Sequence, residues 1–336
     1  MNKIIECIPN FSEGKDARKI ARISGEIEKI KYVKLLNVES NVDYNRTVIT
    51  FAGKPEAVKD AAFYAIEMAA EVIDMSQHKG AHPRIGATDV CPFVPVSNVT
   101  MDECVQIARS LGKEVGEWLG IPVYLYGEAA NVPERHVLPD IRKGEYEGLH
   151  EKFKDEKWMP DYGPIKFNDN VKRTGATVIG AREFLIAYNV NLETKDIQIA
   201  NKISGIVRTS GIVKNNEKGE KVRVPGLLKS VQAMGVYLKE YNIAQVSMNL
   251  LNYKVTPPHM AFEEVRKQAG MLGVQVKGSE IVGLVPKDAL LSAGRFYSRE
   301  SSEEGLVAAA GGGLGLSQLN KFIPEKKVIE YMLGLD

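Results

Sequence analysis

The order of predicted strands and helices most constrains the fold of this chain, because the same order occurs twice. Apolar runs indicate strands at 3–8, 33–38, 46–51 and 90–96 in the first half, and at 184–192, 231–238, 243–253 and 281–285 in the second. In the first half, helical periodicity is seen at Ile20, Ile23, Ile27 and Ile30 and in the segment that begins at Pro55. In the second half, it is seen at Ile197, Ala200, Ile203 and Val207 and in the segment that begins at Pro257. Each half therefore reads β-α-β-β-α-β. This order predicts an α+β fold of two ferredoxin-like (split βαβ) subdomains, each an antiparallel sheet with helices on one face.

Several segments lie outside this repeated order. Thr100 and Glu103 form a capping-box pattern that predicts a helix from Met101. Periodicity is lost between 151 and 172, where Pro and Gly accumulate, so we expect subdomains over 1–174 and 175–300 and a C-terminal extension over 301–336. The charged segment 215–220 predicts a mobile loop. The glycine-rich run 308–316 matches no phosphate-loop pattern and predicts a flexible segment before a short helix at 325–333.

Composition excludes several classes of protein. Forty-four Lys and Arg residues balance 43 Asp and Glu residues, so no overall charge favours nucleic acid or an anionic membrane. Three cysteines without metal-ligand spacing fit a reducing compartment. The N-terminal residues lack an apolar signal region, and no apolar run is long enough to cross a bilayer. We therefore expect a cytoplasmic protein without nucleic-acid or membrane partners.

The stretch from His78 to Val96 gathers ionisable side chains on irregular backbone. Pro83 and the glycines on either side of it oppose a continuous helix, so a loop is expected between two packed elements. His78 and His82 are spaced as metal ligands on a helix would be, but no zincin pattern surrounds them. Three interpretations remain: metal ligands, structural loop histidines, or general acid/base catalysis by one histidine, whose ordinary pKa of about 6.5 suits neutral pH.

Several long motifs in this chain resemble those of glutamate formiminotransferase. They are ECIPNFSEG (6–14), NRTVITFAG (45–53), HKGAHPRIGATDVCPFVPV (78–96), PVYLYGEAA (122–130), PDYGP (160–164), GATVIGAREFLIAYNVNL (175–192) and VGLVP (282–286). The family transfers a formimino group from N-formimino-L-glutamate to N5 of tetrahydrofolate, in histidine degradation. The resemblance covers nearly the whole chain. In some members a cyclodeaminase domain follows; because this chain stops at Asp336, we expect that second activity to be absent.

The resemblance implies which residues carry the site. His82 matches the catalytic histidine, tetrahydrofolate is a co-substrate, no metal is required, and a homodimer is expected. The folate segment corresponds to 163–175, with Gly163, Pro164, Ile165, Lys166, Phe167, Lys172, Arg173 and Gly175 as candidate contacts. Phe167 is the candidate stacking surface. Two extra residues and the pair Lys172-Arg173 depart from the family pattern, which leaves the exact folate contacts open.

The chemistry suggests further candidates. Folate N5 attacks the amidine carbon and glutamate nitrogen leaves, so one proton must be removed and another supplied, and one histidine can do both. Both substrates are polyanions, which favours Arg84 and Arg46 as carboxylate ligands. Asp89 is expected to orient His82 or to contact the pterin. For the arginines, surface or inter-domain ion pairs are the alternative.

The polar face of the strand from Ile243 allows two interpretations. Gln245, Ser247 and Asn249 alternate with apolar residues, which fits either a solvated sheet face or the wall of a substrate cleft between the two halves, as in the family. For the function as a whole, the alternatives are a folate-dependent formyltransferase and a non-enzymatic folate- or amino-acid-binding module.

Overall fold

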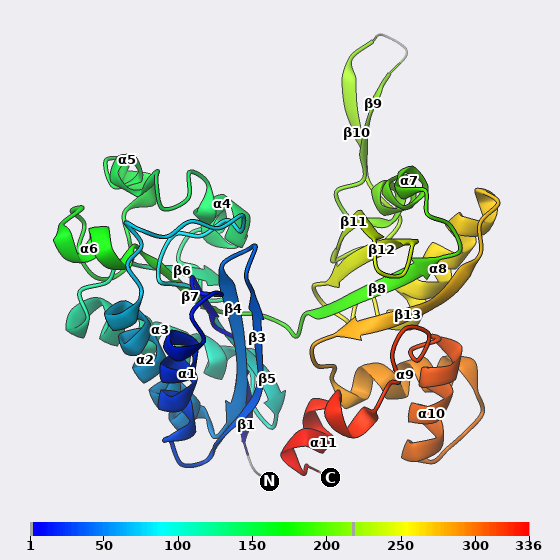
Figure 1. The fold of residues 1–336 in the computed structure, drawn as a ribbon, viewed down its shortest axis with the longest axis horizontal. Coiled ribbons are helices and arrows are strands. Elements are labelled where there is room, and N and C mark those ends of the chain that lie inside the picture. The colour runs from blue at the N-terminus through cyan, green and yellow to red at the C-terminus, as the bar shows by residue number, and fades with distance from the viewer. Residues whose placement is uncertain (1–2, 217–218, 336) are drawn as a thin grey trace. The chain divides into compact units, whose positions relative to one another are not determined.

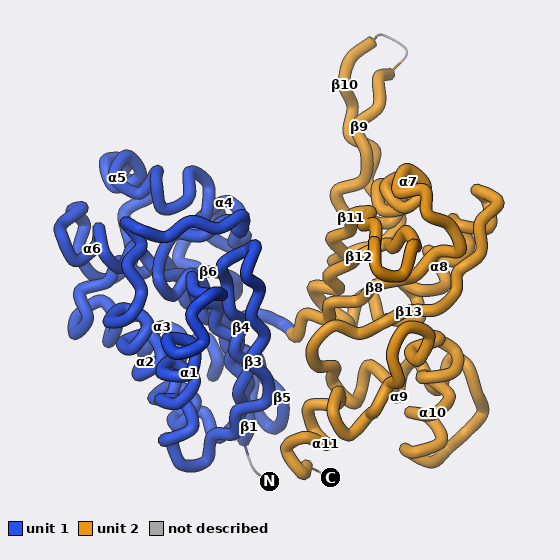
Figure 2. Tube along the Cα trace, in the orientation of Figure 1, with its two compact units in different colours: residues 1–183 blue, residues 184–336 orange. Residues whose placement is uncertain are grey.

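The structure is a computed structural model that describes residues 3–216 and 219–335. It comprises two compact units, residues 1–183 and 184–336, coloured separately in Figure 2. Both units combine helices with β-sheet, so the expected α+β class is confirmed.

The first unit contains a seven-stranded sheet (Figure 1). Its strands are β1 (Ile4–Cys7), β2 (Asn10–Phe11), β3 (Val33–Asn41), β4 (Arg46–Gly53), β5 (Thr88–Ser97), β6 (Val123–Gly127) and β7 (Thr177–Ala181). Its helices are α1 (Ala17–Glu28), α2 (Pro55–Val72), α3 (Met101–Trp118), α4 (Leu138–Arg142), α5 (Leu149–Lys152) and α6 (Asp169–Thr174), with short 3-10 turns η1 (Pro133–Arg135) and η2 (Glu156–Trp158). The predicted elements before Met101 all form.

The first sheet is mixed, and the expectation of a purely antiparallel sheet was wrong here. β3, β4, β1 with β2, and β5 pair antiparallel, but β7 lies between β5 and β6 and is parallel to both. The chain passes from β5 to β6 through helix α3, and a helical crossover brings successive strands into the same direction. The sheet therefore extends beyond the expected four strands.

Helices cover both faces of the parallel part of this sheet, not one face as expected. Side chains of α1, α2 and α3 share a core with Ile5, Phe51 and Phe93. Residues of α4, α5 and α6 form a second core with Tyr124, Tyr126 and Val178. Alternate side chains of a strand point to opposite faces, so each face here has its own apolar layer, as is usual for parallel strands.

The second unit contains a four-stranded antiparallel sheet in the order β11-β12-β8-β13. Its strands are β8 (Ile186–Leu192), β11 (Val231–Leu238), β12 (Ile243–Leu250) and β13 (Val276–Val282), and β9 (Ile212–Asn215) and β10 (Lys221–Val224) form a separate hairpin. Its helices are α7 (Ile197–Val207), α8 (Pro258–Met271), α9 (Lys287–Tyr297), α10 (Glu303–Gly313) and α11 (Ile329–Leu333), with a 3-10 turn η3 (Pro324–Lys326). The predicted β-α-β-β-α-β order recurs in this unit.

The sequence also predicted the domain bounds and three local segments. The two units divide after residue 183, beyond the expected boundary at 174, because β7 is paired within the first sheet, and residues 301–336 lie in the second unit. The last strand spans Val276–Val282, not 281–285. The segment 215–220 connects β9 to β10, as expected of a loop, although residues 217–218 lie outside the described part. The glycine-rich run forms the end of α10 instead of a flexible segment.

Helix α10 packs closely against α9 at one glycine of each helix. A Cβ on Gly294 of α9 would lie 2.1 Å from the carbonyl oxygen of Leu306, and one on Gly313 would lie 2.3 Å from the ring of Tyr297. Close contact with α9 thus offsets the low helix propensity of glycine. In the described residues, no helix is both long and apolar enough to span a bilayer.

Candidate functional site

Three segments of the first unit meet at a narrow pocket. They are the loop after β2, the turn between β3 and β4, and the connection 73–87 between α2 and β5. The pocket is lined by Ser12, Tyr44, Asn45, Arg46, His78, His82, Arg84 and Asp89. The space between these side chains does not admit a water molecule, so the pocket is filled by its own lining side chains.

Asn45 joins the three segments. Its backbone has a φ of 47°, in the left-handed region that asparagine tolerates better than most residues. Its side chain accepts a hydrogen bond from the Gly14 amide (2.9 Å) and donates one to the Lys79 carbonyl (3.0 Å). Its own carbonyl accepts a bond from Nε2 of His78 (3.0 Å). These contacts fix the position of the neighbouring Arg46.

His78 serves as a link in this network. With Nε2 donating to Asn45, its Nδ1 accepts a hydrogen bond from Nε of Arg84 at 3.2 Å. This pattern requires the neutral ring, and burial lowers the pKa of His78, which favours that form. Both ring nitrogens are therefore used in holding the loop.

His82 occupies a different environment from His78. Its Nε2 lies 2.6 Å from Nη1 of Arg46, which donates to it, while its buried Nδ1 makes no hydrogen bond within the described residues. Burial, followed by the positive charges of Arg46 and Arg142, lowers the pKa of His82 to about 4. The imidazole is thus a neutral base at pH 7, with its accepting lone pair on Nε2 blocked by Arg46.

Arg46 lacks a carboxylate partner. Across 3–216 and 219–335, no Asp or Glu oxygen lies within 4 Å of its guanidinium, whose near neighbour is the neutral His82. Burial and the charge of Arg142 lower the pKa of Arg46. A half-buried guanidinium whose near partner is a neutral base can still bind a carboxylate, which suits an anionic ligand.

Arg84 and Asp89 are already engaged. Arg84 is only 6% exposed and donates to Glu145 (2.8 Å) and to both oxygens of Glu147 (2.6 and 2.8 Å). Asp89 accepts a hydrogen bond from the Ile85 amide (2.9 Å) and forms an ion pair with Arg142. No described hydrogen bond joins Asp89 to His82. In this state both residues stabilise the loop and its neighbours.

The segment 163–175 begins away from the pocket and ends against it. Gly163 packs on the connection between α3 and β6, where an added Cβ would lie 2.4 Å from the Ile121 carbonyl oxygen. At the other end, Gly175 has a φ of 69°, and an added Cβ would lie 2.2 Å from the Ile85 carbonyl oxygen. The backbone bonds from Ala87 to Thr174 (2.7 Å) and from Ala176 to Ile85 (2.9 Å) connect this end to the loop that carries His82.

The middle of this segment is only partly available to a ligand. The ring of Phe167 packs against Tyr146, His150 and Phe153, with centroids 5.7–6.5 Å apart. Ile165, Lys166 and Lys172 are exposed, Pro164 is half-buried, and the exposed Arg173 donates to the Glu71 carbonyl. The exposed cations can meet a carboxylate, but the ring of Phe167 already contacts three neighbouring rings.

Several residues of this site could not be identified from the sequence. Arg142 lies in α4, outside every quoted motif, and no pattern linked it to Asp89. Asn45 and Ser12 lie inside quoted motifs, but only the fold reveals what they bond. The side chains that the structure adds to the predicted set are Ser12, Tyr44, Asn45, Arg142, Glu145 and Glu147.

A metal centre has no obvious ligands in this site. Within the residues that the structure describes, no group of three or more His, Cys, Asp or Glu side chains is placed to hold an ion. His78 and His82 do not act as a pair, because one is bonded to Asn45 and Arg84 and the other to Arg46.

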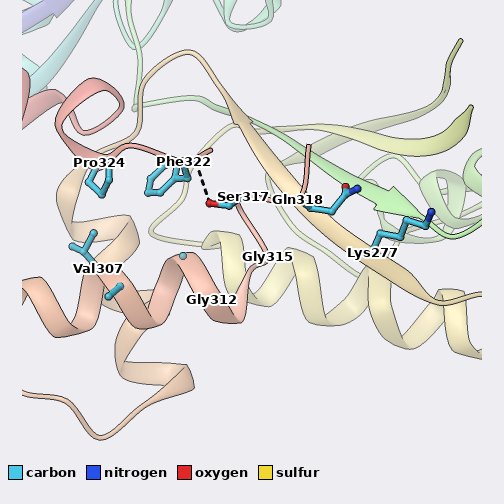
Figure 3. Close-up of a pocket in the computed structure, with 10 residues that line it drawn as sticks. Lys277, Val307, Gly312, Gly315, Ser317, Gln318, Phe322 and Pro324 are labelled. Atoms are coloured by element: carbon cyan, nitrogen blue, oxygen red, sulfur yellow. Dashed lines mark hydrogen bonds between the residues drawn. The ribbon is translucent and has the colours of Figure 1, made fainter. Parts of the chain in front are cut away.

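A larger, shallower pocket lies in the second unit (Figure 3). It has a volume of about 620 Å³ and is lined by Lys277, Val307, Ala308, Gly311, Gly312, Gly315, Ser317, Gln318, Phe322 and Pro324. The Ser317 hydroxyl accepts a bond from the Phe322 amide (3.1 Å), and Gln318 accepts one from Asn191 (2.7 Å). Apart from Lys277, its lining carries no ionisable group, so it lacks the acid/base chemistry of the first pocket.

Comparison with known proteins agrees with this description. Residues 4–182 match the formiminotransferase domain, N-terminal subdomain, and residues 187–334 match the formiminotransferase domain. Glutamate formimidoyltransferase of Thermoplasma acidophilum is 47% identical over 88% of this chain and 92% of its own length. The formimidoyltransferase-cyclodeaminase of Mus musculus is 47% identical over 99% of this chain, which spans 60% of that longer relative. The chain therefore belongs to the formiminotransferase family.

Proposed function

We propose that this protein is a glutamate formiminotransferase, which transfers the formimino group of N-formimino-L-glutamate to N5 of tetrahydrofolate and releases L-glutamate. The observation that carries the proposal is the contact between the neutral base His82 and the unpaired Arg46 in a pocket of the first unit. The relatives named glutamate formimidoyltransferase, of which the chain covers 92% and 94%, support the same reaction.

The transfer needs one group that both removes and supplies a proton. N5 of tetrahydrofolate attacks the amidine carbon, a new N–C bond forms, and N5 loses its proton to Nε2 of His82. The tetrahedral intermediate then collapses, the bond to glutamate nitrogen breaks, and His82 returns the proton to the departing amine. Base and acid are the same imidazole in two successive steps, so no net proton is consumed.

Arg46 controls when His82 becomes available. In the free protein, its guanidinium occupies the lone pair that must accept the proton. A carboxylate of the donor is a stronger acceptor than neutral imidazole, so it draws Arg46 away and neutralises its charge. Both effects raise the pKa of His82 from about 4, while burial, the largest cause of its low pKa, remains. A higher pKa suits return of the proton to the departing amine.

The other predicted contacts are assigned as follows. The exposed residues of 163–175, with Lys166 and Lys172 as cations, receive the glutamate tail of the folate, and Gly163 and Gly175 allow the close backbone approaches at its ends. Arg84 and Asp89 contribute to donor binding through the loop that they hold. Arg84 makes direct contact only if substrate displaces Glu145 or Glu147.

The element order of both units supports ferredoxin-like subdomains, extended in the first unit by parallel strands. Tetrahydrofolate serves as co-substrate and no metal takes part. Three free cysteines favour the cytoplasm. The protein acts on small molecules as a homodimer, without nucleic-acid or membrane partners.

The direct test is incubation of the purified protein with tetrahydrofolate and either N-formimino- or N-formylglutamate, followed by mass analysis of the folate. We expect a formimino adduct and an equal amount of glutamate. A formyl adduct alone would identify a formyltransferase. Folate binding without any adduct would instead identify a binding module.

A further inference from the structure

An exposed aromatic ring lies beside the proposed base. Tyr44, in the turn between β3 and β4, lines the pocket, and its ring centroid lies 6.0 Å from that of His82, with the ring planes 56° apart. The residue is 48% exposed, so much of its surface is free. Chemistry at His82 would therefore take place next to an open aromatic surface.

The position of Tyr44 is fixed by its backbone. Its amide donates to Oδ1 of Asn41 (2.8 Å), and the Ala81 amide donates to the Asp43 carbonyl (3.2 Å). A Cβ on Gly80 would lie 2.3 Å from the Tyr44 carbonyl oxygen, so the glycine lets this turn approach the loop that carries His82. The backbone of this turn is therefore held against the loop that carries His82, whereas the side chain of Tyr44 stays partly exposed.

We propose that Tyr44 is the surface on which the pterin ring of the folate co-substrate stacks, an inference that rests on the proposed function. The space between the lining side chains is too small for a bicyclic ring, whereas the exposed ring of Tyr44, also in the lining, can receive one. The reacting N5 belongs to the pterin, and stacking beside His82 brings N5 next to the base. The other candidate, Phe167, already packs against three aromatic rings.

The donor is a less suitable occupant of this surface. Its glutamate skeleton is flexible, aliphatic and doubly charged, and the unpaired Arg46 already provides for a carboxylate. A planar heterocycle gains most from an aromatic face, because stacking does not depend on matched hydrogen bonds. The two substrates thus use different groups: the donor carboxylate draws Arg46 away from His82, and the exposed ring of Tyr44 receives the pterin.

The test compares two ligands on three variants of the full chain. Calorimetry would measure the dissociation constants of 5-formyltetrahydrofolate and of p-aminobenzoylglutamate, the folate fragment without the pterin. We expect Tyr44→Ala to bind the intact folate about 5- to 100-fold more weakly, the range that loss of one stacked base gives. Its affinity for the fragment should not change.

Two control variants should behave like the unchanged protein. Tyr44→Phe keeps the aromatic ring, and Tyr64→Ala removes a tyrosine of similar exposure (44%) from α2.

Each outcome decides one question. If Tyr44→Ala binds the intact folate normally, the inference is overturned although the proposed function stands. If the fragment is weakened equally, Tyr44 does not contact the pterin. A fall in kcat with unchanged folate affinity would make Tyr44 a positioning residue for His82 and also overturn the inference. If the unchanged protein neither binds folate nor transfers the formimino group, the proposed function itself fails.

Discussion

The two units share an order of elements but differ in one connection. In the first unit, residues 73–87 join α2 to β5 and carry His78, His82 and Arg84. In the second unit, only residues 272–275 join α8 to β13, and they contain no ionisable side chain. The difference teaches that the sheet and helices supply a rigid frame, while a long connection on one copy of that frame supplies the chemistry.

Two polar networks, one in each unit, differ in how completely their groups are paired. In the second sheet, Gln245 donates to Asn191 (2.7 Å) and to Glu280 (2.8 Å), so this network satisfies itself. In the first unit, Nδ1 of His82 has no hydrogen bond within the described residues, and Arg46 has no carboxylate there. A network in which every polar group is hydrogen-bonded stabilises a fold. A histidine nitrogen without a hydrogen bond, beside an arginine without a carboxylate, is instead typical of a ligand site.

The largest expected effect comes from removing the base in the first unit. His82→Ala should lower kcat by about 10²- to 10⁴-fold, the usual loss for a general acid/base. The fold should persist, since the side chain is half-exposed and lies in a loop. Steady-state kinetics with both substrates and thermal unfolding would check this.

Two histidine controls sharpen the result. His78→Ala should cost less activity, because His78 holds the loop without occupying the reacting position. His136→Ala, whose side chain is 56% exposed and distant in sequence from the loop, should have no effect. Equal losses of activity in His78→Ala and His82→Ala would instead favour a role shared by the two residues, such as metal binding.

The next effect concerns the charge that controls His82. Arg46→Ala should raise KM for formiminoglutamate about 10- to 100-fold, because it removes a charge-assisted contact. It should also move the acid limb of kcat/KM upward from about pH 4, since the neutral form of His82 is the base and Arg46 lowers its pKa. Burial, the largest cause of the low pKa, remains and limits this shift. Arg46→Lys keeps the charge, so KM should rise while the acid limb stays. An unchanged limb in Arg46→Ala would show that burial alone sets the pKa.

Much of the fold was predictable from periodicity and caps. The predicted capping box forms at the start of α3. The Glu103 amide donates to Thr100 Oγ1 (3.2 Å), and the Glu103 carboxylate accepts from the Thr100 amide (2.8 Å). The parallel strands β6 and β7 were harder to predict, because a short apolar run in the sequence does not reveal which strands it pairs with. The helical end of α10 was missed since close packing on α9 overrides glycine propensity.

The site was predictable in composition but not in contacts. Gly80, Pro83 and Gly86 identified the loop, and the family motif singled out His82. The contact between Arg46 and His82 joins residues 36 positions apart through the turn at Asn45, which no local pattern encodes. Likewise, the pairing of Arg84 with Glu145 and Glu147 depends on how α4 and α5 pack, so sequence could not distinguish an ion pair from a free ligand group.

Arg84 tests whether the first unit's loop is a binding surface or a scaffold. Arg84→Ala removes the bonds to Glu145 and Glu147 and should lower the free energy of unfolding by about 1–3 kcal/mol. The matched variant Glu147→Gln weakens the same contact without altering the pocket side of Arg84, and should cost less. Chemical denaturation and KM measured together decide the role. Unchanged stability with a raised KM for formiminoglutamate would assign Arg84 to the substrate.

The smallest expected effect lies in the second unit, where the large groove should not matter for transfer. Gly312 lines that groove near the end of α10, and an added Cβ would meet no atom within 4 Å. Gly312→Ala should therefore stabilise the protein by about 0.5–1 kcal/mol through higher helix propensity, with kcat and KM unchanged. Gly313→Ala, one position on, would place its Cβ 2.3 Å from the Tyr297 ring and should destabilise the helix pair. If Gly312→Ala lowered formimino transfer while raising the melting temperature, the groove would belong to the working site, and the division of chemistry between the units would be wrong.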